Sequence, residues 1–366
     1  MTDLLIRKTM ASVLVLVAAS AFGVDPHDLR VGKKEIAATR EQRRALGLPH
    51  FMDGNLGIIE SEDKIWLYGS NGSRPVRVEG TRDKLFQKVA GVSISTSNKK
   101  ARYLSGGPVY RDPESGRIFL FYHAEIHNDK RGKKFYSTIG LSIQTDEAGL
   151  KFQDLGTIFT ANIPNEDAKG AIEVCGAPYV IRDGFFYVYC RDTLSDRRRK
   201  QNNLSVVRAS VSEVINLGLD GKNAEWKKYY LGAFSEPGDG GKSSALELGN
   251  PSTRWMDVTY NRLIKKYIMV VAANTQKRKV DLFLAFSEDC IHWGARRRIT
   301  YENGEVFYPS IVSLGENSRE TGREFYVYYT FSEKGNWDRW EDAVIARRRV
   351  TIAGDEPGKQ GTGDGK

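Results

Sequence analysis

One unit recurs five times along this chain of 366 residues, and it restricts the fold more than any other feature. In each copy a short apolar strand, a polar turn and a longer aromatic and aliphatic strand follow one another. The longer strands are Ile65–Tyr68, Ile118–Tyr122, Phe185–Tyr189, Tyr267–Val271 and Phe325–Tyr329. Continuous apolar runs rich in β-branched and aromatic residues are typical of strands buried on both faces.

A second, more alternating pair of strands follows each hairpin, best seen over residues 141–156 and 282–299. Four strands per unit, repeated at intervals of roughly 50 to 80 residues, predict an all-β fold, a five-bladed β-propeller with four-stranded blades. A β-sandwich is the alternative. It does not require the hairpin to return five times, so the propeller is favoured.

Outside the predicted propeller (residues 49–352) the chain has three further segments. Residues 1–23 have the features of a signal peptide: Arg7 and Lys8 precede an apolar run, and Ala19-Ser20-Ala21 supplies small residues for cleavage. The run is short for a bilayer span of about 20 residues, although an uncleaved anchor is the alternative. We therefore expect a secreted or periplasmic protein without stable membrane insertion after cleavage. Residues 24–48 are expected to form a strap or helix, and residues 353–366 a disordered tail.

Three cysteines are compatible with an oxidising compartment. Cys175 and Cys190 flank a predicted hairpin and lie nearly opposite each other in it, which allows either a cross-strand disulfide or two buried thiols. Cys290 is expected to be buried. The spacing of the three resembles no zinc site.

The ends of the predicted inner and second strands converge on one face of a propeller. Three acids precede inner strands there: Asp53, Glu173 and Asp257. Glycoside hydrolysis requires one carboxyl group as acid and another as base or nucleophile, so these three are the candidate catalytic residues. The second strands add His123, Glu125 and Arg191 as candidate substrate-binding residues, the first two also as proton donors. Trp255 is either a stacking platform for a sugar ring or a core residue.

The formal net charge of +9 and the pI near 9.2 favour acidic partners. Three basic loops follow second strands and are predicted to lie on the same face as the acids: residues 129–134, residues 196–200 with Arg198, and residues 276–279. Arginine side chains suit sulfate, uronate or phosphate groups. An exported protein meets anionic glycans more often than nucleic acid, so we expect an anionic carbohydrate partner and no nucleic acid.

Three phrases carry a resemblance to a known group of enzymes: Met52-Asp53-Gly54, Gly106-Gly107-Pro108-Val109-Tyr110-Arg111-Asp112, and Glu173 through Tyr179. They resemble the five-bladed propeller glycoside hydrolases, such as families 43, 32, 117 and 130, over roughly residues 45–352. The resemblance implies that Asp53 is the base or nucleophile and Glu173 the acid. In that group a second Asp usually precedes the proline of the second blade, and this chain has Gly107 there.

The sequence thus predicts a divergent glycoside hydrolase acting on an anionic or anion-decorated polysaccharide. No cofactor is expected. A structural calcium ion is the alternative, and no motif indicates one. Three alternatives stay open: a phosphate-dependent glycoside phosphorylase, a non-catalytic glycan-binding propeller, and a scaffold for protein partners.

Overall fold

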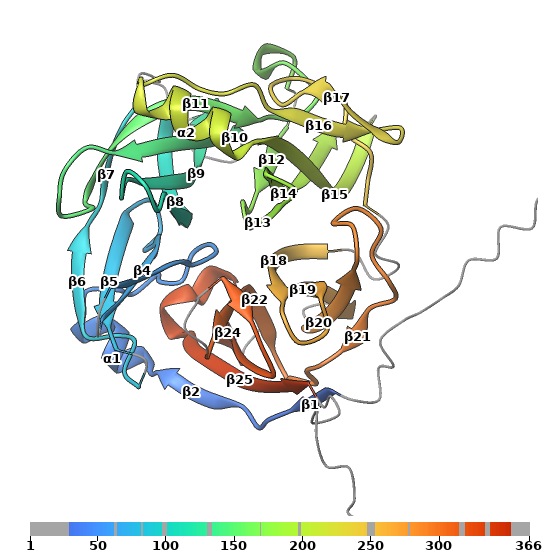
Figure 1. Ribbon diagram of the computed structural model, residues 1–366. Coiled ribbons are helices and arrows are strands. Elements are labelled where there is room, and N and C mark those ends of the chain that lie inside the picture. The colour runs from blue at the N-terminus through green and yellow to red at the C-terminus, as the bar shows by residue number, and fades with distance from the viewer. Residues whose placement is uncertain are drawn as a thin grey trace, which may run out of the picture.

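The computed structural model describes eleven stretches of the chain: residues 29–61, 64–81, 83–96, 101–129, 134–168, 170–196, 199–246, 253–276, 279–314, 319–333 and 337–352. Almost all regular structure in them is β-strand, and the sheets stand as sectors of a ring around a common centre (Figure 1). The predicted all-β propeller is therefore confirmed. The predicted signal peptide and tail lie outside the described residues.

The described strands group into five antiparallel units in chain order. The first unit contains β3 (Gly57–Ser61), β4 (Lys64–Ser70), β5 (Pro75–Gly80) and β6 (Lys88–Gly91). The second contains β8 (Ala101–Arg111), β9 (Ile118–His127), β10 (Phe135–Gln144) and β11 (Lys151–Phe159), with β7 (Ser93–Ser95) parallel to the edge of β11.

The third unit pairs two short strands, β12 (Ile172–Cys175) and β13 (Tyr179–Arg182), with the long β14 (Phe185–Asp196). It continues through β15 (Arg199–Ser210), β16 (Lys227–Tyr230) and β17 (Ala233–Pro237). The fourth unit contains β18 (Thr253–Asn261), β19 (Lys266–Gln276), β20 (Lys279–Ser287) and β21 (Arg297–Arg298), with β23 (Glu320–Thr321) beside β18. The fifth contains β22 (Glu305–Ser313), β24 (Glu324–Ser332) and β25 (Val344–Ile352).

All five hairpins expected from the sequence form, because their second strands are apolar enough to be covered on both faces. Ile268 of β19 packs in a cluster shared with the fifth unit, whereas its neighbour Met269 packs in a cluster shared with the third. Side chains that alternate along a strand point to opposite faces of the sheet. A strand of this kind therefore joins two neighbouring blades, which explains the continuous apolar pattern.

The segment before the first unit closes the ring. Strands β1 (Leu29–Val31) and β2 (Glu35–Ala38) both pair with β25, so the N-terminal segment adds strands to the sheet that holds the C-terminal end of the described chain (Figure 1). Helix α1 (Arg40–Ala45) follows and is capped by Thr39. Its buried Arg43 donates to the carbonyl oxygens of Phe51, Trp340 and Ala343, which fastens the helix to both ends of the ring.

The remaining helices lie in connections. Helix α2 (Val211–Leu219) connects β15 to β16, and the short 3-10 helices η2 (Asn165–Asp167) and η3 (Trp337–Asp342) precede β12 and β25. Within the described ranges there is no helix of the length and apolar character needed to cross a membrane.

The cysteines are three buried free thiols. The register of β12 against β14 pairs Cys175 with Arg191, so the neighbouring Cys190 points to the other face of the sheet. The two thiols accordingly lie in different core clusters, and the disulfide alternative is wrong. Cys290 is fully buried, as expected.

Candidate active site

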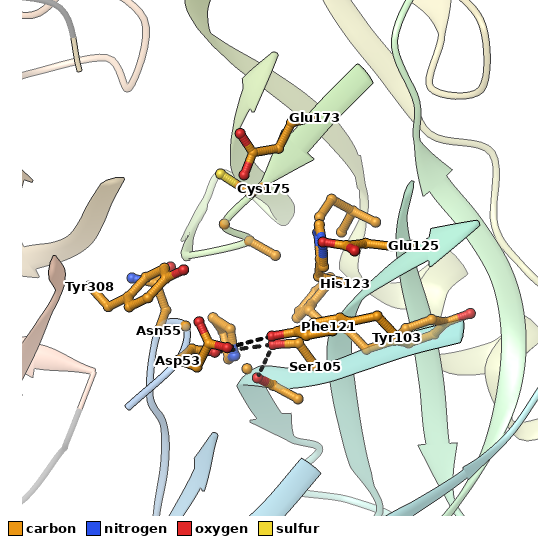
Figure 2. A pocket seen from close by; sticks show the side chains of 18 residues that line it. Asp53, Asn55, Tyr103, Ser105, Phe121, His123, Glu125, Glu173, Cys175 and Tyr308 are labelled. Atoms are coloured by element: carbon orange, nitrogen blue, oxygen red, sulfur yellow. Dashed lines mark hydrogen bonds and ion pairs between the residues drawn. The ribbon is translucent and has the colours of Figure 1, made fainter. Parts of the chain in front are cut away.

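A pocket of about 280 Å³ opens among the first, second, third and fifth units of the ring. Its polar walls carry two of the three candidate catalytic acids, Asp53 and Glu173, together with His123 and Glu125. Figure 2 shows the carboxyl groups of Asp53 and Glu173 entering the pocket from different sides. The structure therefore brings together residues from three distant parts of the sequence: Asp53, the pair His123 and Glu125, and Glu173.

Asp53 lies in the loop that leads into β3. Its amide donates to the carbonyl oxygen of Ser70 over 3.0 Å, which fixes the loop against the end of β4. The hydroxyl of Tyr103 donates to the Asp53 carboxyl over 2.6 Å (Figure 2). Burial raises the pKa of Asp53, although hydrogen bonds from Tyr103 and Tyr308 favour its charged form. This carboxyl group therefore holds a proton at higher pH than an exposed aspartate.

Glu173 has a different electrostatic setting. It stands on β12 opposite Thr193 of β14, and its carboxylate forms an ion pair with the guanidinium of Arg191 two residues earlier on that strand. The Arg191 side chain is 9% exposed and that of Glu173 is 35% exposed, so the glutamate reaches from the arginine toward the pocket. The two pocket acids thus differ in their contacts: the Asp53 carboxyl accepts from a tyrosine hydroxyl, whereas the Glu173 carboxylate contacts a guanidinium.

Strand β9 contributes a row of three polar residues, His123, Glu125 and His127. They are two residues apart, so they share one face of the strand. The Nε2 atoms of the two histidines lie 3.2 and 2.7 Å from the two carboxylate oxygens of Glu125. Burial pushes the pKa of Glu125 upward, but the hydrogen bonds and charges of both histidines outweigh it and leave the pKa below its ordinary value.

His123 is held between two oxygen atoms. Its Nδ1 atom lies 2.9 Å from the carbonyl oxygen of Val174, and its Nε2 atom lies 3.2 Å from the carboxylate of Glu125. Val174 follows Glu173 on β12, so these contacts hold the imidazole ring against the strand that carries Glu173.

The floor of the pocket is built from contacts across the centre of the ring. Asn55 donates to the carbonyl oxygens of Met256 and Pro309 over 2.6 and 3.1 Å, which joins the first unit to the fourth and fifth. Tyr308 adopts a left-handed backbone conformation with φ of 47° and stacks against Trp255 at 4.8 Å between ring centroids. Residues held in such sparsely populated conformations cluster at functional sites.

Asp257 and Trp255 are not where the sequence led us to expect them. Strand β18 begins at Thr253, so Asp257 lies inside the strand rather than before it, and its carboxylate is fully buried. It accepts from the amides of Ile311 and Val258 over 2.6 and 2.9 Å and faces Arg319 at 3.6 Å. Trp255 is 4% exposed and packs in the core, so it is not available as a sugar platform. Neither residue lines the pocket.

Asp257→Asn is expected to destabilise the fold by about 1–3 kcal/mol while leaving turnover on any substrate within about threefold. The amide group of Asn would turn an N–H toward one of the two backbone amides, which leaves buried donors without an acceptor. Thermal unfolding and steady-state kinetics of the purified variant test this. A stable variant without activity would return Asp257 to the catalytic set.

The other predicted features are placed less fully. Arg191 lies behind Glu173 and Cys175 rather than on the pocket surface. Arg198 and the central parts of the three basic loops lie outside the described residues. Across the ranges that the structure describes, no group of three or more His, Cys, Asp or Glu side chains is placed to hold a metal ion.

Sequence reasoning missed Tyr103, Tyr308, Asn55 and Cys175, which also line the pocket. Of these, only Asn55 carried a signal, since it follows Asp53-Gly54 in the loop that opens the first unit. Tyr103 reaches the pocket because β8 and β9 continue past the expected hairpin, with a register shift between Gly106 and Val109.

No protein-family model matches the chain, and no curated protein matches it in sequence. Solved structures do match its fold. A family 117 glycoside hydrolase from the marine bacterium Zobellia galactanivorans is 10% identical, with a TM-score of 0.54, over 92% of this chain and 90% of that one. An α-L-arabinofuranosidase from Podospora anserina, solved in complex with cellotriose, is 9% identical, with a TM-score of 0.54, over 81% and 90%.

The catalytic domain of a family 62 α-L-arabinofuranosidase from Coprinopsis cinerea is 9% identical, with a TM-score of 0.53, over 82% of this chain and 90% of that one. These matched structures are propeller glycoside hydrolases that span most of the chain. At this identity the likeness establishes the fold.

Proposed function

We propose that this protein is a glycoside hydrolase that acts on an anionic or anion-decorated polysaccharide by acid/base carboxyl chemistry, with Asp53 and Glu173 as the reacting pair. The observation that carries the proposal is the placement of these two carboxyl groups, from different units, in one pocket. Glycoside cleavage requires one protonated and one ionised carboxyl group on either side of the bond.

The resemblance assigns the base to Asp53 and the acid to Glu173. In the free protein Glu173 is ion-paired with Arg191, so under this assignment a bound sugar displaces that contact before the glutamate donates a proton. His123 and Glu125 line the same pocket and are further candidate proton donors. Tyr103 and Tyr308 hold the carboxyl group of Asp53 in place for attack or for activation of a water molecule.

A screen of neutral and acidic polysaccharides, read for released reducing ends, tests the proposal. Each polysaccharide is incubated with and without inorganic phosphate, because cleavage that depends on phosphate would indicate a phosphorylase instead. The Asp53→Asn variant serves as the blank. Release that is equal in the parent protein and in this blank would contradict the assigned site.

A non-catalytic glycan-binding protein is the second candidate. The Glu173–Arg191 ion pair favours it, since the carboxyl group of the expected acid is already engaged by an arginine, and so does Gly107 in place of an acid. Binding of a glycan without turnover, in the absence or presence of phosphate, would identify this function. The features of residues 1–23 support action in a secreted or periplasmic setting, which fractionation of expressing cells would test.

A further inference from the structure

Arg254 is near enough to Glu173 and Tyr308 of the pocket wall for their charges to act on its guanidinium, although it does not itself line the pocket. In the described part of the chain no hydrogen bond or ion pair holds this guanidinium. It is the extra residue of a β-bulge: Thr253 pairs with Ala273 and Trp255 pairs with Ala272, which leaves Arg254 without an opposite residue on β19. Bulges next to active sites re-aim a side chain. The guanidinium lies over the Trp255 ring at 4.6 Å from its centroid.

Arg191 lies on the other side of this contact. Its guanidinium is 5.8 Å from the centroid of the same Trp255 ring, and its Nε atom is buried without a hydrogen-bond partner. The residue as a whole is 7% exposed. Two guanidinium groups thus flank one indole, and only one of them is paired, through Glu173.

The surroundings of Arg254 disfavour its charge. Burial and the neighbouring Arg191 lower the pKa of Arg254, whereas Glu305, Tyr308 and Glu173 act in the opposite direction. Among the described residues neither carboxylate forms an ion pair with Arg254, and Glu173 is paired with Arg191 instead. A guanidinium in this position can accept an oxyanion from a ligand without breaking an existing ion pair.

We propose that Arg254, supported by Arg191, forms a subsite for the carboxylate or sulfate group of a sugar bound beside Glu173. Both oxyanions match the planar fork of donors that a guanidinium presents. The subsite names Arg254 as the side chain that would recognise the anionic group of the glycan. It rests on the proposed function in one respect, that the bound ligand is a sugar.

The test compares glycans that differ only in charge. Binding of oligogalacturonides, neutral galacto-oligosaccharides and sulfated galacto-oligosaccharides of equal length is measured by calorimetry, in the Asp53→Asn background so that no ligand is cleaved. Arg254→Gln is expected to weaken binding of the preferred charged series by tenfold or more and of the neutral series by less than about twofold. Arg254→Lys, which keeps the charge but loses the fork, is expected to fall between the two. The charged series that responds identifies carboxylate or sulfate.

Arg262→Gln is the matched control. It removes the same charge at the other end of β18, where the side chain is 54% exposed and faces Glu320 at 3.7 Å. We expect it to change the affinity for either series by less than about twofold. Equal weakening by Arg254→Gln and Arg262→Gln, or no preference for charged glycans in the parent, would overturn the subsite.

These outcomes are separate from those of the proposed function. Hydrolysis of neutral glycans that is insensitive to Arg254 would refute the subsite and leave the hydrolase standing. Selective binding of charged glycans through Arg254, without turnover by the parent protein, would support the subsite and refute the hydrolase.

Discussion

Asp53→Asn is expected to lower the rate of glycoside cleavage by about a thousandfold and to leave the protein at least as stable as the parent at neutral pH. The loss of rate follows because the amide neither accepts nor delivers the proton that the reaction moves. Kinetics on the substrate identified by the screen, together with thermal unfolding of both proteins, provide the measurement.

The effect on stability has a defined pH dependence. Burial raises the pKa of Asp53, so the folded protein prefers the protonated form more than the unfolded chain does. The stabilisation from that preference is complete below the unfolded pKa of about 3.9 and is lost as pH rises through the folded value. The Asn variant has no such loss. Its melting temperature relative to the parent should therefore increase from pH 4 to pH 8.

Asp183→Asn is a suitable control because it makes the same chemical change in the exposed turn between β13 and β14. Its side chain is 78% exposed and its φ of 50° lies in the left-handed region that Asn tolerates. Both activity and stability should stay at the parent level. An Asp53→Asn variant that retained near-parent turnover would remove Asp53 from the reacting pair.

Glu173→Gln is expected to lower cleavage of unactivated glycosides by about a hundredfold to ten-thousandfold, the range typical of a lost general acid. Aryl glycosides with acidic phenol leaving groups need little protonation, so the same variant should cleave them at a rate much closer to that of the parent. Steady-state kinetics on both substrate types give the comparison. The amide oxygen still accepts from Arg191, so the fold should survive.

The dependence on the leaving group also decides between two assignments. If Glu173→Gln loses activity equally on both substrate types, Glu173 is not the proton donor. If the dependence appears in Asp53→Asn instead, the two carboxyl groups have exchanged roles, an order that agrees with the raised pKa of the buried Asp53.

Much of the fold could be predicted because its determinants are local. A strand buried on both faces must be continuously apolar, and five such runs with their turns are legible without any knowledge of distant contacts. The same pattern predicted the pocket. Asp53 and Glu173 precede the first strand of a hairpin, and His123 and Glu125 follow the apolar run of a second strand. In a propeller these ends meet on one face.

The predictions from sequence failed where a strand continues beyond its apolar residues. Thr253 to Met256 extend β18 before the expected start, which moved Asp257 into the core beside Ile311. Tyr103 was missed for the same reason on β8. The bulge that frees Arg254 depends on how β18 aligns with β19, and no local pattern encodes that alignment.

Gly107 needs a separate explanation, because the enzymes that the sequence resembles usually have an acid there. A Cβ atom at this position would meet its nearest neighbour, the carbonyl oxygen of Phe121, at 3.4 Å, which is ordinary contact. Steric exclusion therefore does not account for the glycine. His123 and Glu125, from β9 of the second unit, are titratable side chains that line the same pocket.

The pairing of β1 with β25 has a consequence for the order of folding. Leu29 pairs with Ile352, about 320 positions away in the sequence. Contacts of such long sequence separation form late, because the entropy of closing the intervening loop must be overcome first. The units can assemble one after another while the chain is synthesised, but the sheet that holds both ends stays incomplete until β25, the last strand, is available. Until then β1 and β2 lack their partner strand. Once β25 has formed, the residues from Leu29 to Ala38 cover the hydrogen-bonding edge that it would otherwise present to other chains.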